Sequence, residues 1–296
     1  MKFLGTVTKN TTATCDNVQD PKILSHQLLN TKKQPRFKKY NQVRISEIGT
    51  FCSREYALGF KTEAQQKSWV EFGLQQQFDL GSAIHWYLQN KSNVFNIYGN
   101  WACRGCGQIR LTKYGTKYFG QKPKTKCLNC GASHQATEYS EFYFRLESPY
   151  RIVGKIDGVI KKDDVYRFVD FKSYFEVPKS GFPSAKDVAQ LSAYAYFYNF
   201  APEEDKFPVQ IDTNTSYLHY ISKKFSYSES ILTFPVSPSE KLLEVMKKKV
   251  RDFTISTEGG PLPEPLDPCV RNEFNAGRSK DCFMRDLCQQ YYRDGQ

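Results

Sequence analysis

The chain has 296 residues, 40% of them hydrophobic and 25% charged, a composition that excludes a wholly disordered protein. It contains no run of 18 apolar residues, and its first ten residues, MKFLGTVTKN, lack the apolar stretch of a signal peptide. We therefore expect no membrane span, no secretion and a cytoplasmic location. The 42 Lys and Arg residues exceed the 31 Asp and Glu residues, giving a net charge of +11 that favours a polyanionic partner such as nucleic acid.

Five segments are expected along the chain: a basic N-terminal arm (1–43), a mostly helical segment (44–98), an insertion (99–137), a core of sheet and helices (138–256) and a C-terminal cysteine segment (257–296). The arm contains TKKQPRFKKY, with five positive charges and two aromatic residues, which is either solvated or a nucleic-acid contact. Asp79 is a candidate N-cap for the last helix of the second segment, and this helix carries His85.

The insertion carries four of the nine cysteines. An odd number of cysteines argues against a framework of disulfides and for metal binding in a reducing compartment. The four form two C-x₂-C pairs, separated by twenty residues and each followed by glycine: Cys103, Cys106, Cys127 and Cys130. This spacing predicts a structural zinc site that folds a segment too polar to fold alone.

The basic residues of this zinc ribbon leave two interpretations open. They are either a DNA-contacting surface or solvated side chains of a scaffold: Trp101, Arg104, Arg110, Lys113, Lys117, Lys122 and Lys124. His134, just after the second C-x₂-C pair, is interpreted as incidental.

The segment from 138 to 256 predicts alternating strands and helices. Strands are expected at 138–147, 151–160, 165–174, 216–222 and 230–236. Ser184 and Asp187 form a capping box for one helix, and Ser237 is the expected cap of another, with Glu240 at its third position. Neither a P-loop nor a dinucleotide-binding fingerprint occurs, which excludes an ATP-driven motor within this chain as far as motifs can.

The run RIVGKIDGVIKKDDVYRFVDFKSY predicts an antiparallel hairpin. If Asp163 and Asp164 form a two-residue turn, Asp157 lies directly opposite Asp170. A four-residue loop over 161–164 makes the two aspartates diagonal neighbours instead, and both registers place them on one face. Neither turn has the glycine that a tight hairpin prefers.

Two ionised aspartates this close repel each other and require a cation. Oxygen ligands suit Mg²⁺ or Mn²⁺, and Lys172, two residues after Asp170, points to the same side, where it can hold a water or stabilise a developing negative charge. Lys155 is expected beside the pair as well. Taken alone, Asp-x-Lys is a weak motif, and alternating ion pairs on a solvated strand are the alternative.

Four short motifs follow one another along the chain: Gly81-x-x-x-His85, Gly154-x-x-Asp157-Gly158, Asp170-Phe171-Lys172 and Gln190-x-x-x-Tyr194. In this order they resemble the RecB-type branch of the PD-(D/E)xK nucleases. Within that branch, the sequence is similar to the CRISPR-associated exonucleases that hold an iron–sulfur cluster on cysteines, and to their phage relatives. The resemblance spans most of the chain and implies an α/β, restriction-endonuclease-like fold: a mixed central sheet flanked by helices, with the zinc ribbon inserted and a cysteine-bound cluster near the C-terminus.

The resemblance also implies roles for individual residues. His85, Asp157 and Asp170 would be ligands of Mg²⁺ or Mn²⁺ together with the backbone carbonyl of Phe171, and Lys172 would assist the attack of water. Gln190 and Tyr194 would line the site and help to place Lys172 or the DNA backbone. An imidazole ligand should shift the preference toward Mn²⁺. Glu141 and Glu147 lie on the preceding strand, from which they could approach the site, and a surface position is the favoured interpretation for both.

The same relatives bind a 4Fe–4S cluster through one cysteine before the histidine motif and three near the C-terminus. The corresponding positions here are Cys52, Cys269, Cys282 and Cys288. The interval between Cys269 and Cys282 is longer than in the family, so zinc, or no metal, stay as alternatives. Cys15 is expected to be free.

The resemblance therefore predicts a metal-dependent deoxyribonuclease, an exonuclease that acts on DNA ends, either single-stranded or duplex. It implies a role in recombination, phage DNA metabolism or the trimming of CRISPR spacers, with a helicase, recombinase or integrase as a possible partner. The alternatives are a non-catalytic DNA-binding or scaffold protein and an endonuclease with the same chemistry.

Overall fold

A computed structural model describes residues 34–70, 72–91, 95–111, 117–147, 149–175, 182–223, 231–266 and 282–293. Its centre is a five-stranded sheet in the order β12 (Ile231–Val236), β11 (Ile211–Ser222), β10 (Val165–Tyr174), β9 (Gly158–Lys162) and β4 (Ile97–Tyr98). The pair β10–β11 is parallel and the other pairs are antiparallel, so the sheet is mixed, as expected.

The hairpin β9–β10 uses the two-residue turn. Lys162 pairs with Val165, and Asp163 and Asp164 both have positive φ angles, of 52° and 61°. Aspartate tolerates this left-handed conformation, so two aspartates replace the glycine that such a turn usually requires.

The hairpin is shorter than expected, however. Its pairing ends at Gly158 and Val169, and the preceding strand β8 (Ile152–Ile156) belongs to another sheet, with β2 (Val43–Arg44) and β7 (Phe142–Leu146). Asp157 lies between the two strands, so it is not paired with Asp170 in a ladder. The expectation of one continuous hairpin is wrong, because this run of chain passes from one sheet to another at Asp157.

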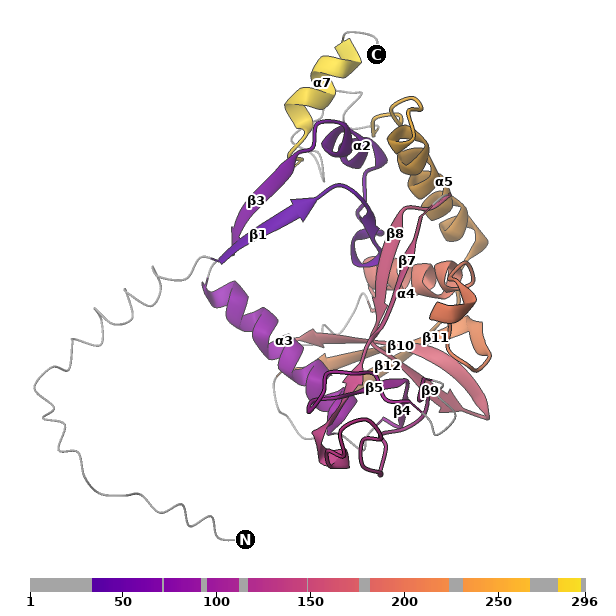
Figure 1. Cartoon of the computed structure of the whole chain (residues 1–296). Coiled ribbons are helices and arrows are strands. Elements are labelled where there is room, and N and C mark those ends of the chain that lie inside the picture. The colour runs from indigo at the N-terminus through magenta and orange to yellow at the C-terminus, as the bar shows by residue number, and fades with distance from the viewer. Residues whose placement is uncertain are drawn as a thin grey trace, which may run out of the picture.

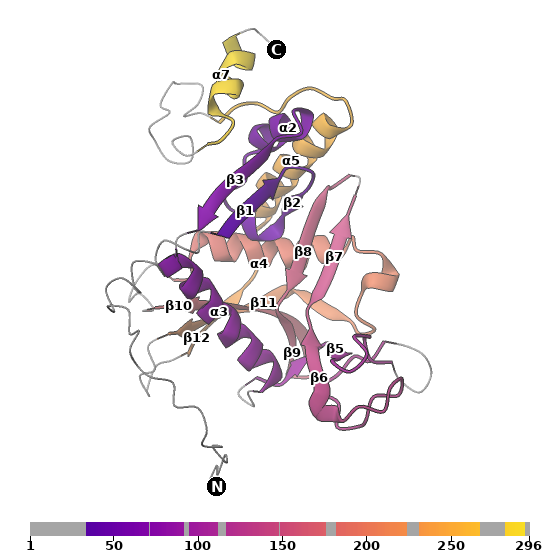
Figure 2. The same cartoon turned by 60° about the vertical axis from the view of Figure 1, so that its left-hand side comes forward.

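Two helices flank the five-stranded sheet, α3 (Phe72–Asn90) and α4 (Ala185–Tyr198) (Figures 1 and 2). Phe168 of β10 belongs to the main core together with Leu191 of α4, whereas its neighbour Val169 belongs to a second apolar cluster with Leu88 of α3. Because successive residues of a strand face opposite sides, the two helices cover opposite faces of β10. None of the described helices is both long and apolar enough to cross a membrane.

The part preceding α3 contains more β-structure than predicted. Strand β1 (Gln34–Lys39) pairs with β3 (Gln65–Val70), so the strand lies inside the segment expected to be an arm and its partner lies inside the segment expected to be helical. The turn η1 (Ile45–Glu47) and helix α2 (Ser53–Lys61) separate the two strands. Residues 1–33 of the predicted arm lie outside the described residues.

Helix α2, early in the described part of the chain, packs against two helices from its C-terminal part. It contacts α5 (Glu240–Thr257) and α7 (Arg285–Arg293), and the three helices lie together at one end of the molecule (Figure 1). The other short elements are η3 (Glu203–Asp205) and, in the ribbon, η2 (His134–Ala136).

Strands β5 (Asn100–Cys103) and β6 (Thr137–Ser140) pair with each other and form the stem of the predicted ribbon. Cys103 pairs with Thr137, and Asn100 pairs with Ser140. The insertion therefore leaves the core and returns to it at neighbouring points.

The capping predictions had different outcomes. Ser184 caps α4 by accepting a hydrogen bond from the Asp187 backbone amide, as predicted. Helix α5 is capped by Ser239 and not by Ser237, so the helix begins two residues later than expected. Asp79 does not cap α3, which begins at Phe72, and its carboxylate instead accepts a hydrogen bond from Gln75.

The close approach of α4 to β8 requires glycine at position 154. A Cβ atom there would lie 2.7 Å from Cδ1 of Ile45 and 2.8 Å from a ring carbon of Tyr194. We predict that Gly154→Ala lowers the free energy of unfolding by about 1–3 kcal/mol in urea titrations, because a packed core must move to accept the methyl group.

Gly73→Ala is the matched control, since a Cβ at this position in α3 meets no atom within 4 Å. Its stability should be unchanged or higher by up to about 1 kcal/mol, because alanine favours helix more than glycine does. Equal stabilities of the two variants would contradict this account of Gly154.

Candidate active site

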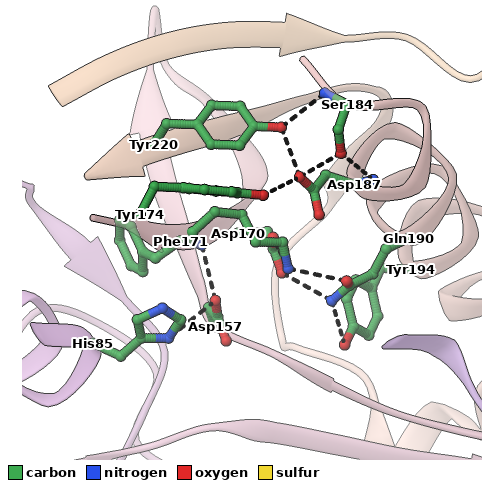
Figure 3. Close-up of polar contacts among 11 residues, drawn as sticks. His85, Asp157, Asp170, Phe171, Tyr174, Ser184, Asp187, Gln190, Tyr194 and Tyr220 are labelled. Atoms are coloured by element: carbon green, nitrogen blue, oxygen red, sulfur yellow. Dashed lines mark hydrogen bonds and ion pairs between the residues drawn. The ribbon is translucent and has the colours of Figure 1, made fainter. Parts of the chain in front are cut away.

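Four elements bring six predicted residues together between α3 and α4 (Figure 3). Helix α3 supplies the histidine, the β8–β9 junction and β10 supply the carboxylates and the lysine, and α4 supplies the amide and the phenol: His85, Asp157, Asp170, Lys172, Gln190 and Tyr194. The residues are far apart in sequence, so the fold itself assembles this arrangement.

Asp157 is held by two contacts. Its Oδ2 accepts a hydrogen bond of 2.9 Å from the backbone amide of Phe171 and lies 3.5 Å from Nδ1 of His85. The Phe171 side chain is buried in the second apolar cluster, on the face of β10 covered by α3. This residue, predicted to contribute its carbonyl to a metal, therefore also fixes a carboxylate through its amide.

Asp170 and Lys172 are joined by Gln190. The lysine Nζ lies 2.7 Å from Oδ2 of Asp170 and donates to Oε1 of Gln190 at 3.0 Å. The Gln190 Nε2 donates to Oδ1 of Asp170 at 3.2 Å and contacts the Tyr194 hydroxyl at 3.4 Å. One amide thus contacts both the carboxylate and the ammonium group.

Burial is the largest single influence on the pKa of Asp157, His85 and Lys172. It raises the pKa of Asp157 well above its usual value, and the charge of Asp170 raises it further. Burial lowers the pKa of His85, so its imidazole is neutral at pH 7, the form that binds metals. Burial also disfavours charged Lys172, but Asp170 and Asp157 outweigh it and raise the pKa of this lysine.

The donor set fits a divalent cation by its chemistry, since two carboxylates and an imidazole suit Mn²⁺ or Mg²⁺. The ligand atoms of His85, Asp157 and Asp170 are not yet arranged as a closed cage, because they do not all lie within 4.8 Å of one another. Lys172 occupies one side of Asp170. His85 and Asp157 are close neighbours, whereas the ligand atoms of all three residues together are less closely grouped.

A network that sequence reasoning missed lies behind the site. Oδ2 of Asp187 accepts hydrogen bonds from the Ser184, Tyr174 and Tyr220 hydroxyls at 2.6, 3.0 and 2.9 Å (Figure 3). Burial raises the pKa of both tyrosines, so they stay protonated donors. The network ties the first turn of α4 to β10 and β11, one turn before Gln190. The capping box was its only sequence signal.

Glu141 approaches the site, which was the less favoured of its two interpretations. Its Oε1 is 3.4 Å from Nε2 of Gln89, whose amide also donates to the backbone oxygen of Asp157 at 2.8 Å. The expectation of a surface position holds only for Glu147, which pairs with Arg145 and Arg151. The signal for Glu141 was its place just before β7, the strand that pairs with β8.

His219 is a buried histidine outside the predicted set. Its ring contacts those of Phe95 and Phe171, which also contact each other, and Nδ1 is 2.8 Å from the Thr233 hydroxyl. Burial lowers its pKa to about 4, so it is neutral at pH 7 and packs as a core side chain.

The ribbon cysteines form a second candidate metal centre. Among the described residues, they are the one group of at least three Cys, His, Asp or Glu whose ligand atoms lie within 4.8 Å of one another: Cys103, Cys106, Cys127 and Cys130. The sulfur atoms of Cys103 and Cys130 are 3.6 Å apart, and those of Cys106 and Cys127 are 4.0 Å apart. Tetrahedral Zn–S bonds of ~2.3 Å imply sulfur separations of about 3.8 Å, so the group fits a metal ion.

The backbone of the ribbon places amide groups beside the cysteine sulfurs. Gly107 and Gly131, each just after a C-x₂-C pair, have φ angles of 71° and 72°, the left-handed conformation that glycine adopts without strain. Backbone amides of Cys130 and Asn129 lower the pKa of Cys127 to about 6. The residues that follow these glycines, Gln108 and Ala132, direct their backbone amides at the sulfurs of Cys106 and Cys130.

Two of the ribbon residues considered as DNA contacts are structural. Trp101 is 2% exposed and Arg110 is 5% exposed, and the arginine donates to Thr125 and to the backbone oxygen of Lys126. Arg104 pairs with Glu138. The two buried side chains hold the ribbon together and are not available to DNA.

The ribbon docks on the C-terminal half of α3. Trp86, next to His85, donates its indole N–H to Glu138 at 2.9 Å, and the Asn90 side chain accepts from the Tyr139 amide at 2.6 Å. The ribbon stem thus supports the helix that carries the candidate histidine ligand.

The second cysteine set is only partly described. Cys52 is buried at the N-cap of α2, and Cys288 lies in α7, where its sulfur is 3.3 Å from Nε of Arg54. Cys269 lies outside the described residues. The sulfurs of Cys52, Cys282 and Cys288 do not all lie within 4.8 Å of one another, so the described residues alone form no iron–sulfur ligand set.

The chain belongs to the PD-(D/E)XK nuclease superfamily, whose family model matches residues 47–289, most of the sequence. The nuclease class expected from the motifs is therefore confirmed, and the RecB-type branch and the CRISPR-associated subgroup stay predictions. No curated protein sequence matches the chain.

Among the solved structures similar to it are the following three. The "Crystal structure of SSO0001" is 14% identical with a TM-score of 0.34, covering 86% of this chain and 91% of the other. A complex of the exonuclease LHK-Exo with dAMP is 10% identical with a TM-score of 0.37, covering 74% and 89%. The alkaline exonuclease LHK-Exo from Laribacter hongkongensis is 8% identical with a TM-score of 0.36, covering 75% and 90%.

The Asp187 network yields a stability prediction. Asp187→Ala should lower the free energy of unfolding by about 3 kcal/mol, because three hydroxyls lose a charged acceptor. Tyr220→Phe removes one of these bonds and should cost about 1–2 kcal/mol. Chemical denaturation followed by circular dichroism measures both.

The control is Asp252→Ala, whose carboxylate pairs with exposed Lys248 on α5. This surface ion pair should contribute less than about 1 kcal/mol. If Asp187→Ala is no less stable than Asp252→Ala, the network does not anchor α4.

Proposed function

We propose that the protein is a metal-dependent nuclease that hydrolyses phosphodiester bonds of DNA. The observation that carries this proposal is that one polar site contains two groups of contacts. His85 contacts Asp157, and Gln190 contacts both Asp170 and Lys172, which form an ion pair. Charged groups buried this close together cost folding energy, and their juxtaposition is typical of catalytic sites. The net charge of +11 supports a polyanionic substrate.

His85, Asp157 and Asp170 would hold Mg²⁺ or Mn²⁺, which supplies Lewis-acid activation of water and neutralises charge on the phosphate. The Phe171 amide fixes one carboxylate oxygen of Asp157, leaving the other for a ligand. Gln190 keeps the Lys172 ammonium beside Asp170, where it would orient the attacking water or donate to the developing negative charge. Tyr194 positions Gln190 through its hydroxyl.

The proposal that this nuclease cuts at DNA ends rests on the sequence resemblance to RecB-type exonucleases. Such an activity would serve recombination, phage DNA metabolism or CRISPR spacer processing, with a helicase, recombinase or integrase delivering the DNA. The competing endonuclease and pure DNA-binding functions are distinguished by the experiment below.

Lys172→Ala should reduce cleavage at least about 10²-fold while DNA binding is retained, because the lysine stabilises charge that develops only during the reaction. The assay compares linear with covalently closed circular DNA in Mn²⁺, Mg²⁺ or EDTA, using anaerobically purified protein. Metal-dependent loss of the linear DNA alone is the expected result.

Lys161→Ala is the matched control, since this lysine pairs with Asp164 at the end of the same hairpin, and it should cleave like the wild type. Cutting of both DNA forms would indicate an endonuclease. Full activity of Lys172→Ala would refute the assignment of Lys172, and binding without cutting in any metal would favour a DNA-binding protein.

We further propose that the ribbon holds zinc, in keeping with its four thiols and their spacing. Cys127→Ser should lose about one equivalent of zinc per chain by elemental analysis and make the ribbon sensitive to proteolysis, because the metal folds this polar segment. Cys52→Ser should retain this zinc. Unchanged zinc content in Cys127→Ser would contradict the assignment.

An iron–sulfur cluster on Cys52, Cys269, Cys282 and Cys288 stays a separate proposal. Its support is the contact of α2, which begins just after Cys52, with α7, which contains Cys288, and the hydrogen bond from Arg54 to the Cys288 sulfur. Iron and acid-labile sulfide in the anaerobically purified protein would establish it, and their absence would leave zinc or no metal.

A further inference from the structure

Gln89 connects the helix of the candidate histidine ligand to the backbone of a candidate carboxylate ligand. It lies on α3, four residues after His85, and its Nε2 donates a hydrogen bond of 2.8 Å to the backbone oxygen of Asp157. Residues four apart share a face of a helix. The same face of α3 therefore contacts Asp157 at two points, through His85 at the carboxylate and through Gln89 at the backbone.

The backbone of Asp157 needs such a contact because it lies outside both ladders. β8 ends at Ile156, which pairs with Phe142, and β9 begins at Gly158, which pairs with Val169. A buried backbone carbonyl without a hydrogen-bond donor is unfavourable, and within a sheet the neighbouring strand supplies that donor. At this junction the donor is the side-chain amide of α3 instead.

The surroundings of the amide decide which of its ends faces Asp157. Nε2 also lies 3.4 Å from Oε1 of Glu141. Both neighbours, a backbone carbonyl and a carboxylate, accept hydrogen bonds, and only the NH₂ end of an amide can donate them. Gln89 is 8% exposed, so water competes little for these contacts. The amide is therefore held in one orientation, with its donor toward the candidate site.

The position of α3 does not depend on this amide. Leu88 packs in the second apolar cluster, and Trp86 and Asn90 form hydrogen bonds with the stem of the ribbon. These contacts hold the helix, and with it the candidate histidine, in place. Loss of the Gln89 donor would therefore release the backbone of Asp157 from α3 without displacing the helix.

We propose that Gln89 is a positioning residue of the metal site: it holds the backbone of Asp157 against α3, so that the carboxylate of Asp157 and the imidazole of His85 bind the same divalent cation. Gln89 contacts a ligand and not the cation, so it acts only through Asp157. Groups that orient metal ligands in this way typically contribute about 10–100-fold to metal affinity. This role rests on the proposed function, in which His85 and Asp157 bind a metal.

The test measures Mn²⁺ binding by the full chain without DNA. Gln89→Met keeps the length of the side chain but has no N–H to donate, and it should weaken Mn²⁺ binding about tenfold or more in titrations followed by the electron paramagnetic resonance of free Mn²⁺. Carboxylates and imidazole suit Mn²⁺, whereas thiolates favour zinc, so the titration reports on the candidate active site and not on the ribbon.

Gln89→Ala is the second variant, because it leaves space for a water molecule that can donate to the free carbonyl. A water restores the hydrogen bond but does not tie Asp157 to α3. Mn²⁺ binding should therefore be weakened in this variant as well, even where the folded state tolerates it better than Gln89→Met.

The bound ion gives a readout that a loss of stability alone would not change. An imidazole nitrogen bound to Mn²⁺ modulates the electron spin echo of the ion. At saturating Mn²⁺, this modulation should be present in the wild type and reduced in Gln89→Met, because one cation no longer reaches both His85 and Asp157.

Two controls separate positioning from stability. Gln76→Met makes the same substitution at an exposed position of α3. Thr254→Val removes a buried hydroxyl on α5 that accepts from the Arg151 amide at 3.0 Å, so it also loses a buried hydrogen bond. Both should bind Mn²⁺ like the wild type. Wild-type Mn²⁺ affinity in Gln89→Met, or an equal loss of affinity in Thr254→Val, would overturn the proposal.

The role of Gln89 and the nuclease activity fail in different ways. If the wild type cleaves DNA in Mn²⁺ and Gln89→Met binds the ion equally well, the positioning role is wrong and the nuclease stands. If the wild type binds Mn²⁺ without cleaving, the nuclease proposal fails, and the Gln89 variants still decide the positioning role. If the wild type binds no Mn²⁺, both proposals are overturned.

Discussion

Two buried carboxylates beside each other are unfavourable unless positive charge accompanies them, and this constraint organises the centre of the molecule. Asp170 is paired with Lys172 and accepts a hydrogen bond from Gln190, whereas Asp157, whose pKa is raised by burial, has one backbone amide and the neighbouring neutral His85. The elements around them serve this arrangement. Helix α4 brings the amide, α3 brings the imidazole, and the Asp187 network fixes α4 against the sheet.

The change of sheet at Asp157 leaves the backbone of this residue outside both ladders. A residue inside a ladder has its backbone direction set by both neighbours, whereas Asp157 lies between β8 and β9, where one sheet ends and the other begins. Glycines on either side permit close packing there, since a Cβ at Gly158 would lie 3.1 Å from Val169.

Much of this could be predicted from the sequence because its signals are local. The two-residue turn of β9–β10, one of the two turns considered, the cap at Ser184 and the spacing of the ribbon cysteines depend on neighbouring residues. The errors come from long-range pairing. β1 and β3 are polar strands that pair only with each other, and no periodicity indicated that β8 would leave the hairpin. The Asp187 network and Glu141 likewise depend on residues brought together by the tertiary fold.

The stem of the ribbon has a topological consequence. Asn100 and Ser140 are ladder partners at its base, so the two points at which the insertion leaves and re-enters the core are adjacent. A connection between adjacent ends carries little loop-closure entropy, and its length hardly changes that cost. The tip of the ribbon can thus lengthen, shorten or be replaced over evolution while the sheet keeps its register, provided that the contacts of the stem with α3 are kept.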